Sequence, residues 1–120
     1  MVRTESRDGG RTWSEGTDSS LPNPNAAVDF LRLQSGHHLL VYNHSFTNRT
    51  PLSAALSVDG AKTFSHRRDL ETDPKGDFGY PTALQTRDGK IHVLYTSDER
   101  TVVRRIVLTE AELTVGTPAP

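Results

Sequence analysis

Polar side chains that could take part in binding or catalysis gather at the ends of two expected strands. Asn25 and Asp29 open one strand, and His44 follows the next. Because neighbouring strands of a hairpin run in opposite directions, we expect these side chains at one end of the sheet. Asp29 falls in an apolar strand, where a carboxylate needs a partner. It could support Arg49, serve as a substitute acid, or remain a solvated carboxylate that faces the central channel.

The simpler interpretation of the two asparagines before this strand is that they form turns. Asn23 and Asn25 alternate with Pro22 and Pro24, and Asx residues beside proline commonly initiate turns. We expect Trp13 to belong to the core of another turn. The 5 histidines have no spacing that would compose a metal site, so we expect neither a metal nor a cofactor.

The elements that would position these residues are marked by a turn that occurs twice. The copies run from Ser6 to Trp13 and from Ser57 to Phe64. In each copy a serine and an aspartate can bond to nearby backbone amides, a glycine supplies a positive φ, and an aromatic residue closes the turn. Two copies about fifty residues apart, each in a run of short strands, indicate a repeat at the period of a β-propeller blade.

The strands around these turns predict an all-β fold, a β-propeller fragment of four-stranded antiparallel blades. We expect residues 1–21 to supply the outer strands of an incomplete blade and residues 22–76 to form a complete blade. Residues 77–110 would form a last blade that lacks its outer strand, and residues 111–120 a loosely held tail. The chain therefore holds about two to two and a half blades.

Superposing the two later blades tests the repeat. Gly36 falls on Gly89, Tyr42 falls on Tyr95, and the same offset places Tyr80 at the start of an innermost strand. In a propeller this position borders the central channel, where ligand-binding groups converge. The simpler role for Tyr80 is that its ring covers the top of the core.

Composition limits the classes of partner. The chain has 120 residues and a formal net charge of −1, so no strong field would steer it to nucleic acid or to an anionic membrane, and we expect neither as a partner. We find no apolar segment that resembles a secretion signal or a membrane span. The sequence does not decide the compartment: either the chain stays inside the cell, or an export signal belongs to another part.

A propeller needs four to eight blades, so we expect a piece of a larger protein or a subunit completed by assembly.

The two turns resemble the Asp-box, or BNR repeat, of sialidases (neuraminidases), whose fold is a six-bladed β-propeller. The segment from Tyr80 to Tyr95 is similar to the final blade of that family, which opens with a tyrosine-serine pair, turns at Asp-Gly and ends in Leu-Tyr. The resemblance implies that Tyr80 is the catalytic nucleophile, with Pro81 in place of the usual serine. It covers nearly the whole chain, from Ser6 to about Leu108.

The preceding blade carries a second match. The residues from Leu40 to His44, a polar loop with Arg49, and the segment from Leu52 to Ser57 are similar to the penultimate blade of sialidases. In that family an arginine here is the last of three that hold the substrate carboxylate, and the resemblance gives this role to Arg49. Its planar guanidinium binds a carboxylate through two parallel hydrogen bonds and stays charged. The alternative is an exposed loop arginine.

The resemblance implies part of an exo-glycosidase that hydrolyses terminal sialic acid or a similar acidic sugar, with a glycan as partner. The other catalytic residues of the family map before Met1, so we expect the isolated chain to be weak or inert. The alternatives are a non-catalytic carbohydrate-binding module and a structural propeller subunit completed by oligomerisation, because open sheet edges at both ends need covering. The candidate site residues are Tyr80 as the catalytic residue, with Arg49, Asp29, Asn25 and His44 for substrate binding.

Overall fold

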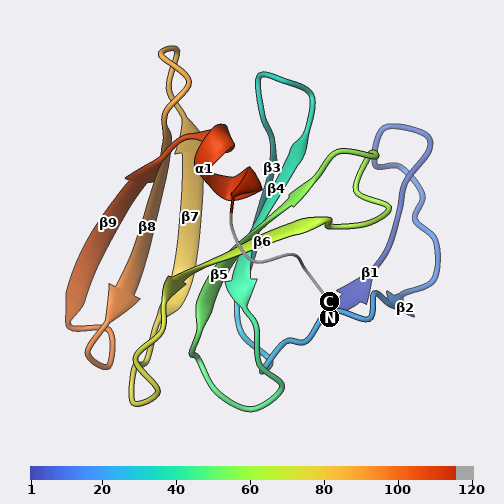
Figure 1. The fold of residues 1–120 in the computed structure, drawn as a ribbon. Coiled ribbons are helices and arrows are strands. Elements are labelled where there is room, and N and C mark those ends of the chain that lie inside the picture. The colour runs from blue at the N-terminus through green and yellow to red at the C-terminus, as the bar shows by residue number, and fades with distance from the viewer. Residues whose placement is uncertain (116–120) are drawn as a thin grey trace.

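The computed structural model describes residues 1–115 as three antiparallel sheets and one short helix (Figure 1). The first sheet pairs β1 (Val2–Arg3) with β2 (Thr17–Asp18). The second contains β3 (Asp29–Arg32), β4 (His38–Asn43), β5 (Leu52–Ser57) and β6 (His66–Glu71). The third contains β7 (Gly79–Gln85), β8 (Ile91–Ser97) and β9 (Val102–Leu108), and the helix α1 (Glu110–Thr114) follows. Strands pair in chain order, which confirms the all-β antiparallel meander.

The two larger sheets pack face to face, as blades of a propeller do. Side chains alternate between the two faces of a strand, and the inward-facing ones form one apolar cluster. Its strand members that are no more than 2% exposed are Leu39, Val41, Leu52, Ala54, Leu56, Ile91, Val93 and Tyr95. This cluster holds the first strands of the two sheets, β3 and β7, side by side.

Strands β4 and β5 are buried on both faces, which agrees with their sequences of mostly apolar and small residues. A second cluster covers the face that points away from β7. It consists of Leu40, Tyr42 and Ala55, with Met1, Leu21 and Phe64 packed against them. The matching outer face of the third sheet is open, and Val103 there is 70% exposed.

The two Asp-box turns have matching hydrogen bonds. In the second, the amide of Ala61 donates to Ser57 Oγ at 2.9 Å, and Asp59 accepts from the amide and hydroxyl of Thr63 at 2.9 and 2.6 Å. In the first, Asp8 accepts the same pair of bonds from Thr12 at 2.9 and 2.6 Å. These donors stabilise the carboxylates: hydrogen bonds from Thr12 lower the pKa of Asp8 to about 2, and those from Thr63 lower the pKa of Asp59.

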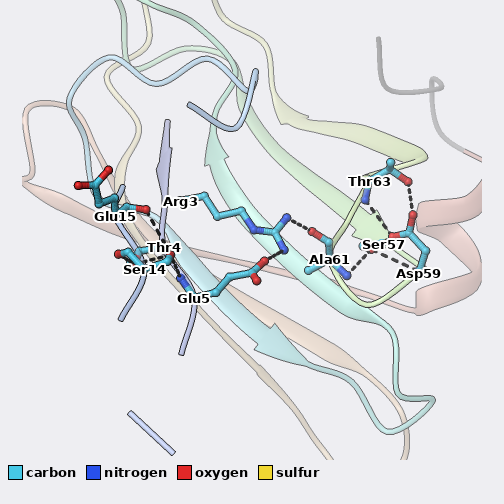
Figure 2. Close-up of polar contacts among 9 residues, drawn as sticks. All are labelled: Arg3, Thr4, Glu5, Ser14, Glu15, Ser57, Asp59, Ala61 and Thr63. Carbon is cyan, nitrogen blue, oxygen red and sulfur yellow. Dashed lines mark hydrogen bonds and ion pairs between the residues drawn. The ribbon is translucent and has the colours of Figure 1, made fainter. Parts of the chain in front are cut away.

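Arg3 connects the first sheet to the second Asp-box turn (Figure 2). Its guanidinium donates to the carbonyl of Ala61 and, at 2.6 Å, to the carboxylate of Glu5. Beside it lies an open polar hollow of about 530 Å³, lined by Arg3, Thr4, Glu5, Ser14, Glu15 and Thr17. The N-terminal segment is thus tied to the blade that follows it by the Arg3–Ala61 hydrogen bond and by the second apolar cluster.

The N-terminal strands are only two residues long each, and the structure corrects the role predicted for Trp13. The strand residues are Val2–Arg3 and Thr17–Asp18, because the hydrogen bonds of Asp8 and Ser14 hold the segment between them in turns. Trp13 is 61% exposed and donates from Nε1 to the carbonyl of Gly10 at 3.1 Å. The Trp13 ring therefore lies on the solvent-exposed side of its turn, whereas Phe64 of the second turn packs against the second apolar cluster.

The prediction of a loosely held tail is wrong for the residues of α1. Thr109 caps this helix: its hydroxyl accepts from the amide of Glu112, whose carboxylate accepts from the amide of Thr109 at 2.6 Å. Leu113 is 1% exposed and joins the main apolar cluster, with α1 lying against β5 and β6. Residues 116–120 of the predicted tail lie outside the described residues. Among residues 1–115, no helix has both the length and the apolar character required to cross a bilayer.

Candidate functional site

Arg49 and Tyr80 lie together at one end of the two packed sheets. Arg49 is in the β4–β5 loop, and Tyr80 is the second residue of β7. Asn43 at the end of β4 donates from Nδ2 to the carbonyl of Phe78 at 3.0 Å, which joins this end of the second sheet to the start of the third. As a result, Cζ of Arg49 lies 5.1 Å from the centroid of the Tyr80 ring. A guanidinium at this distance is attracted by the aromatic face.

The backbone around β7 fixes the position of Arg49. The amide of Phe78 donates to the carbonyl of Arg49 at 3.0 Å. Gly79 leaves room for the side chain, since a Cβ built on it would lie 2.6 Å from Nη1 of Arg49. The carboxylate of Asp77 lies 4.0 Å from Nε of Arg49, and the Arg49 side chain is 29% exposed. The guanidinium is therefore held in place while part of it faces solvent.

Tyr80 has an unusual backbone and an accessible ring. Its φ is +50°, in the left-handed region that few residues other than glycine adopt. The residue is 49% exposed, so the expectation that it merely covers the core does not describe its surroundings. Hydrogen bonding and positive charge from Arg100 first, and then from Arg49, lower the pKa of the Tyr80 phenol below its ordinary value.

Arg100 is a residue of this site that the sequence analysis did not single out. It lies in the turn between β8 and β9, with Cζ 6.0 Å from the centroid of the Tyr80 ring. The internal repeat carries the signal that could have found it. The offset that superposes Tyr42 on Tyr95 also brings the β4–β5 loop, which holds Arg49, opposite the β8–β9 turn.

Asp29 lies at the same end of the two sheets, and its carboxylate accepts hydrogen bonds from β7 and from its own strand. Its Oδ2 accepts from the amide of Ala83 at 2.7 Å and from the hydroxyl of Thr82 at 3.4 Å, and its Oδ1 accepts from the amide of Phe30. The structure thus places this carboxylate as a link between β3 and β7 and does not bring it to Arg49. The partner that a carboxylate in this strand requires is the neighbouring innermost strand.

Within the described residues, Asn25 and His44 form no hydrogen bond with Arg49 or Tyr80. Asn25 is exposed, with φ of +59°, in a turn that is closed by hydrogen bonds between Asn23 and Ala26. This agrees with the interpretation of both asparagines as turn residues. His44 bonds instead to residues on the face of β4 that points away from β7.

The imidazole of His44 is held on both sides. Nη1 of Arg67 lies 2.6 Å from Nε2, and the hydroxyl of Tyr42 lies 2.6 Å from Nδ1. Arginine can only donate, so Nε2 accepts and Nδ1 carries the proton. Burial and then the charge of Arg67 lower the pKa of His44, and burial raises the pKa of Tyr42 to about 12. Asp69 completes this group of side chains, with Oδ1 3.3 Å from Nε of Arg67.

Comparison with known proteins identifies the family. Residues 1–93 match the model of the family described as BNR repeat-like domain. Among curated proteins, no sequence matches this chain. The matched part contains both Asp-box turns, Arg49 and Tyr80, and it ends within β8. The sequence, the paired turns and the stacked antiparallel sheets agree, and the chain belongs to the BNR repeat-like domain family.

Proposed function

We propose that the protein acts on terminal sialic acid or a similar acidic sugar in the manner of a sialidase, with Arg49 binding the carboxylate and Tyr80 acting as the nucleophile. The observation that carries this proposal is the 5.1 Å separation between the Arg49 guanidinium and the ring of Tyr80 at one end of the blades. The two residues come from the loop of one sheet and the first strand of the next, and their proximity supports the roles that the resemblance to sialidases gives them.

The proposed chemistry uses both side chains. The planar fork of Arg49 would bind the sugar carboxylate and orient the ring. The phenol of Tyr80 would lose its proton, and its oxygen would form a bond to the anomeric carbon as the bond to the leaving oxygen breaks; the leaving oxygen would take up a proton and depart as the alcohol. Water would then cleave the tyrosyl bond and release the sugar. The lowered pKa of Tyr80 supports this role, because it increases the fraction of phenolate near neutral pH.

A second candidate is a carbohydrate-binding module that holds the same sugar without hydrolysing it. Pro81 favours this candidate, because it stands where the sialidase pattern has serine and it provides no hydroxyl beside Tyr80. Arg49 would keep its role in binding, and the exposed ring of Tyr80 would supply an apolar surface for the sugar.

The test compares Tyr80→Phe with the parent protein in an assay on an aryl sialoside. Phenylalanine keeps the ring and removes only the attacking oxygen. If Tyr80 is the nucleophile, turnover falls by orders of magnitude while the melting temperature and sugar affinity change little. Turnover within a few-fold of the parent would refute the nucleophile role. Sugar binding by both proteins with no turnover by either would select the binding module.

A further inference from the structure

The turn between β8 and β9 has a strained backbone that directs Arg100 to Tyr80. Asp98, Glu99 and Arg100 have φ values of +51°, +55° and +69°, so three successive L-residues adopt the left-handed conformation. The turn is held by hydrogen bonds from the amide and the hydroxyl of Thr101 to the carbonyl of Asp98, at 3.2 and 2.6 Å. Such a conformation persists only where the surrounding structure holds it, and it is typical of binding and switch regions.

Arg104 supports the same turn from β9. Its Nη2 lies 3.7 Å from the carboxylate of Asp98, and its Nη1 lies 3.7 Å from the carboxylate of Glu71. Glu71 in turn accepts a hydrogen bond from the hydroxyl of Tyr95. Arg104 thus pairs with the carboxylates of Glu71 and Asp98, whereas the guanidinium of Arg100 lies over the ring of Tyr80.

The charge around Tyr80 is unbalanced. Two guanidinium groups lie within 6.0 Å of its ring centroid. The carboxylate of Asp77, 40% exposed, reaches Arg49 only at 4.0 Å, and within residues 1–115 no carboxylate forms an ion pair with Arg100. Two weakly compensated cations beside a half-exposed phenol form a site that favours an anion.

The two arginines come from equivalent loops of successive blades. Arg49 is in the loop between the second and third strands of its sheet, and Arg100 is in the turn between the second and third strands of the next. The repeat therefore presents one cation from each blade to Tyr80, which begins the first strand of the later blade. This arrangement would let one small anion contact both guanidinium groups.

We propose that Arg100 is a second anion-binding arginine of the Tyr80 site and that it binds, together with Arg49, the carboxylate of an acidic sugar. The inference rests on the proposed function and names a residue which that function did not include. It predicts that the affinity for the sugar depends on Arg100 as strongly as on Arg49.

The experiment titrates the chain with N-acetylneuraminic acid, with its methyl ester and with acetate, followed by amide chemical shifts in NMR spectra. The variants are Arg49→Ala, Arg100→Ala and Arg100→Lys, with Arg105→Ala as the matched control. Arg105 is an exposed arginine of β9 on the other face of the same sheet from Arg104.

We expect the free acid to bind and the ester to bind poorly. Either alanine variant should weaken binding by about tenfold, a typical loss for one charge-assisted contact. The lysine variant should recover little, and the control should match the parent.

A second measurement reports on the arrangement without any ligand. The chain has 3 tyrosines. Tyr80 has a lowered pKa, whereas burial raises the pKa of Tyr42 and of Tyr95, so Tyr80 should ionise first in an ultraviolet titration. Arg100→Ala should move this first ionisation up toward the ordinary tyrosine value near 10, and Arg105→Ala should leave it unchanged.

The outcomes separate this inference from the proposed function. If only Arg49→Ala weakens binding of the acid, the role of Arg100 is refuted and the sugar site stands. If acetate binds with the same affinity as the sugar, and its binding depends on both arginines, the two-arginine anion site is supported and the acidic-sugar function is refuted. If the parent binds neither acid, both proposals are wrong. Equal losses for Arg49→Ala and Arg100→Ala with the sugar alone would support both.

Discussion

Gly79 occupies the position against which the guanidinium of Arg49 packs, because a Cβ on this glycine would lie 2.6 Å from Nη1 of Arg49. The glycine stands at the start of β7, directly before Tyr80. Its backbone is outside the left-handed region, so the absence of a side chain here provides space and not conformational freedom. Gly79 thus controls the approach of Arg49 to the ring of Tyr80.

Gly79→Ala should displace the Arg49 guanidinium with little loss of stability, because the clashing atom is the end of a flexible side chain. Without this neighbour, the pKa of Tyr80 should rise toward its ordinary value, which an ultraviolet titration would measure. The double variant with Arg49→Ala is the control, since Gly79→Ala should add nothing there. A further rise in the double variant would show that the glycine acts by another route.

Asp29→Ala should destabilise the fold by about 1–2 kcal/mol, because the amide of Ala83 loses a charge-assisted hydrogen bond between β3 and β7. Asp29→Asn should cost less, since its amide oxygen can still accept. Urea denaturation measures both. An unchanged midpoint for Asp29→Ala, together with a loss of sugar binding, would instead make this carboxylate a site residue.

Leu113→Ala should destabilise the protein by about 2–3 kcal/mol, because it opens a cavity where α1 packs on β5 and β6. Leu84→Ala is the matched control. Leu84 is 50% exposed, so its truncation should cost less than about 0.5 kcal/mol. Equal effects in thermal denaturation would mean that α1 contributes nothing to the core.

Acidification should destabilise the protein through His44. The folded state lowers the pKa of His44 below the value of 6.5 for the unfolded chain, so the unfolded state binds the proton more tightly. The stabilisation is complete above pH 6.5 and is lost as the pH falls toward the folded pKa. His44→Gln should therefore flatten the dependence of stability on pH between 7 and 5. A parent whose stability does not change between pH 7 and 5 would contradict the prediction.

The open edge of β9 should cause association through the N-terminal hairpin of a second copy. Within residues 1–115, β9 pairs only with β8, and its edge carries the exposed Val102 and Val103. Unpaired strands of this kind recruit other strands. Light scattering should show mass that increases with concentration, and Val103→Lys should reduce it more than Val58→Lys, a change at an exposed turn residue. A monomer at high micromolar concentration would refute this.

The sequence predicted the meander because local patterns determine it. Strands β4 and β5 appear as apolar runs, and the two Asp-box turns are visible as matched serine, aspartate and glycine positions. It did not predict which partner each polar group would take. Asp29 bonds to Ala83, 54 positions later, and nothing in the local pattern specifies that contact.

Two other features were missed for different reasons. The sequence from Thr109 to Glu112 has the pattern of a capping box, which marks the start of α1. The helix was missed because it is only 5 residues long and depends on burial of Leu113 for its stability. Arg100 was missed because its turn uses left-handed residues that are not glycine, and strained positions of this kind contradict local preference.

The Asp-box turns lie at the opposite end of the blades from Tyr80. Ser57, where the second turn begins, pairs with His38, whereas the β4–β5 loop that holds Arg49 starts beyond the pairing of Asn43 with Leu52. The chain contains no cysteine, so Lys62→Cys would place a single thiol at an exposed turn position. A sensor surface coupled through this thiol would hold every molecule in one orientation, with the arginine-flanked tyrosine directed to the solution.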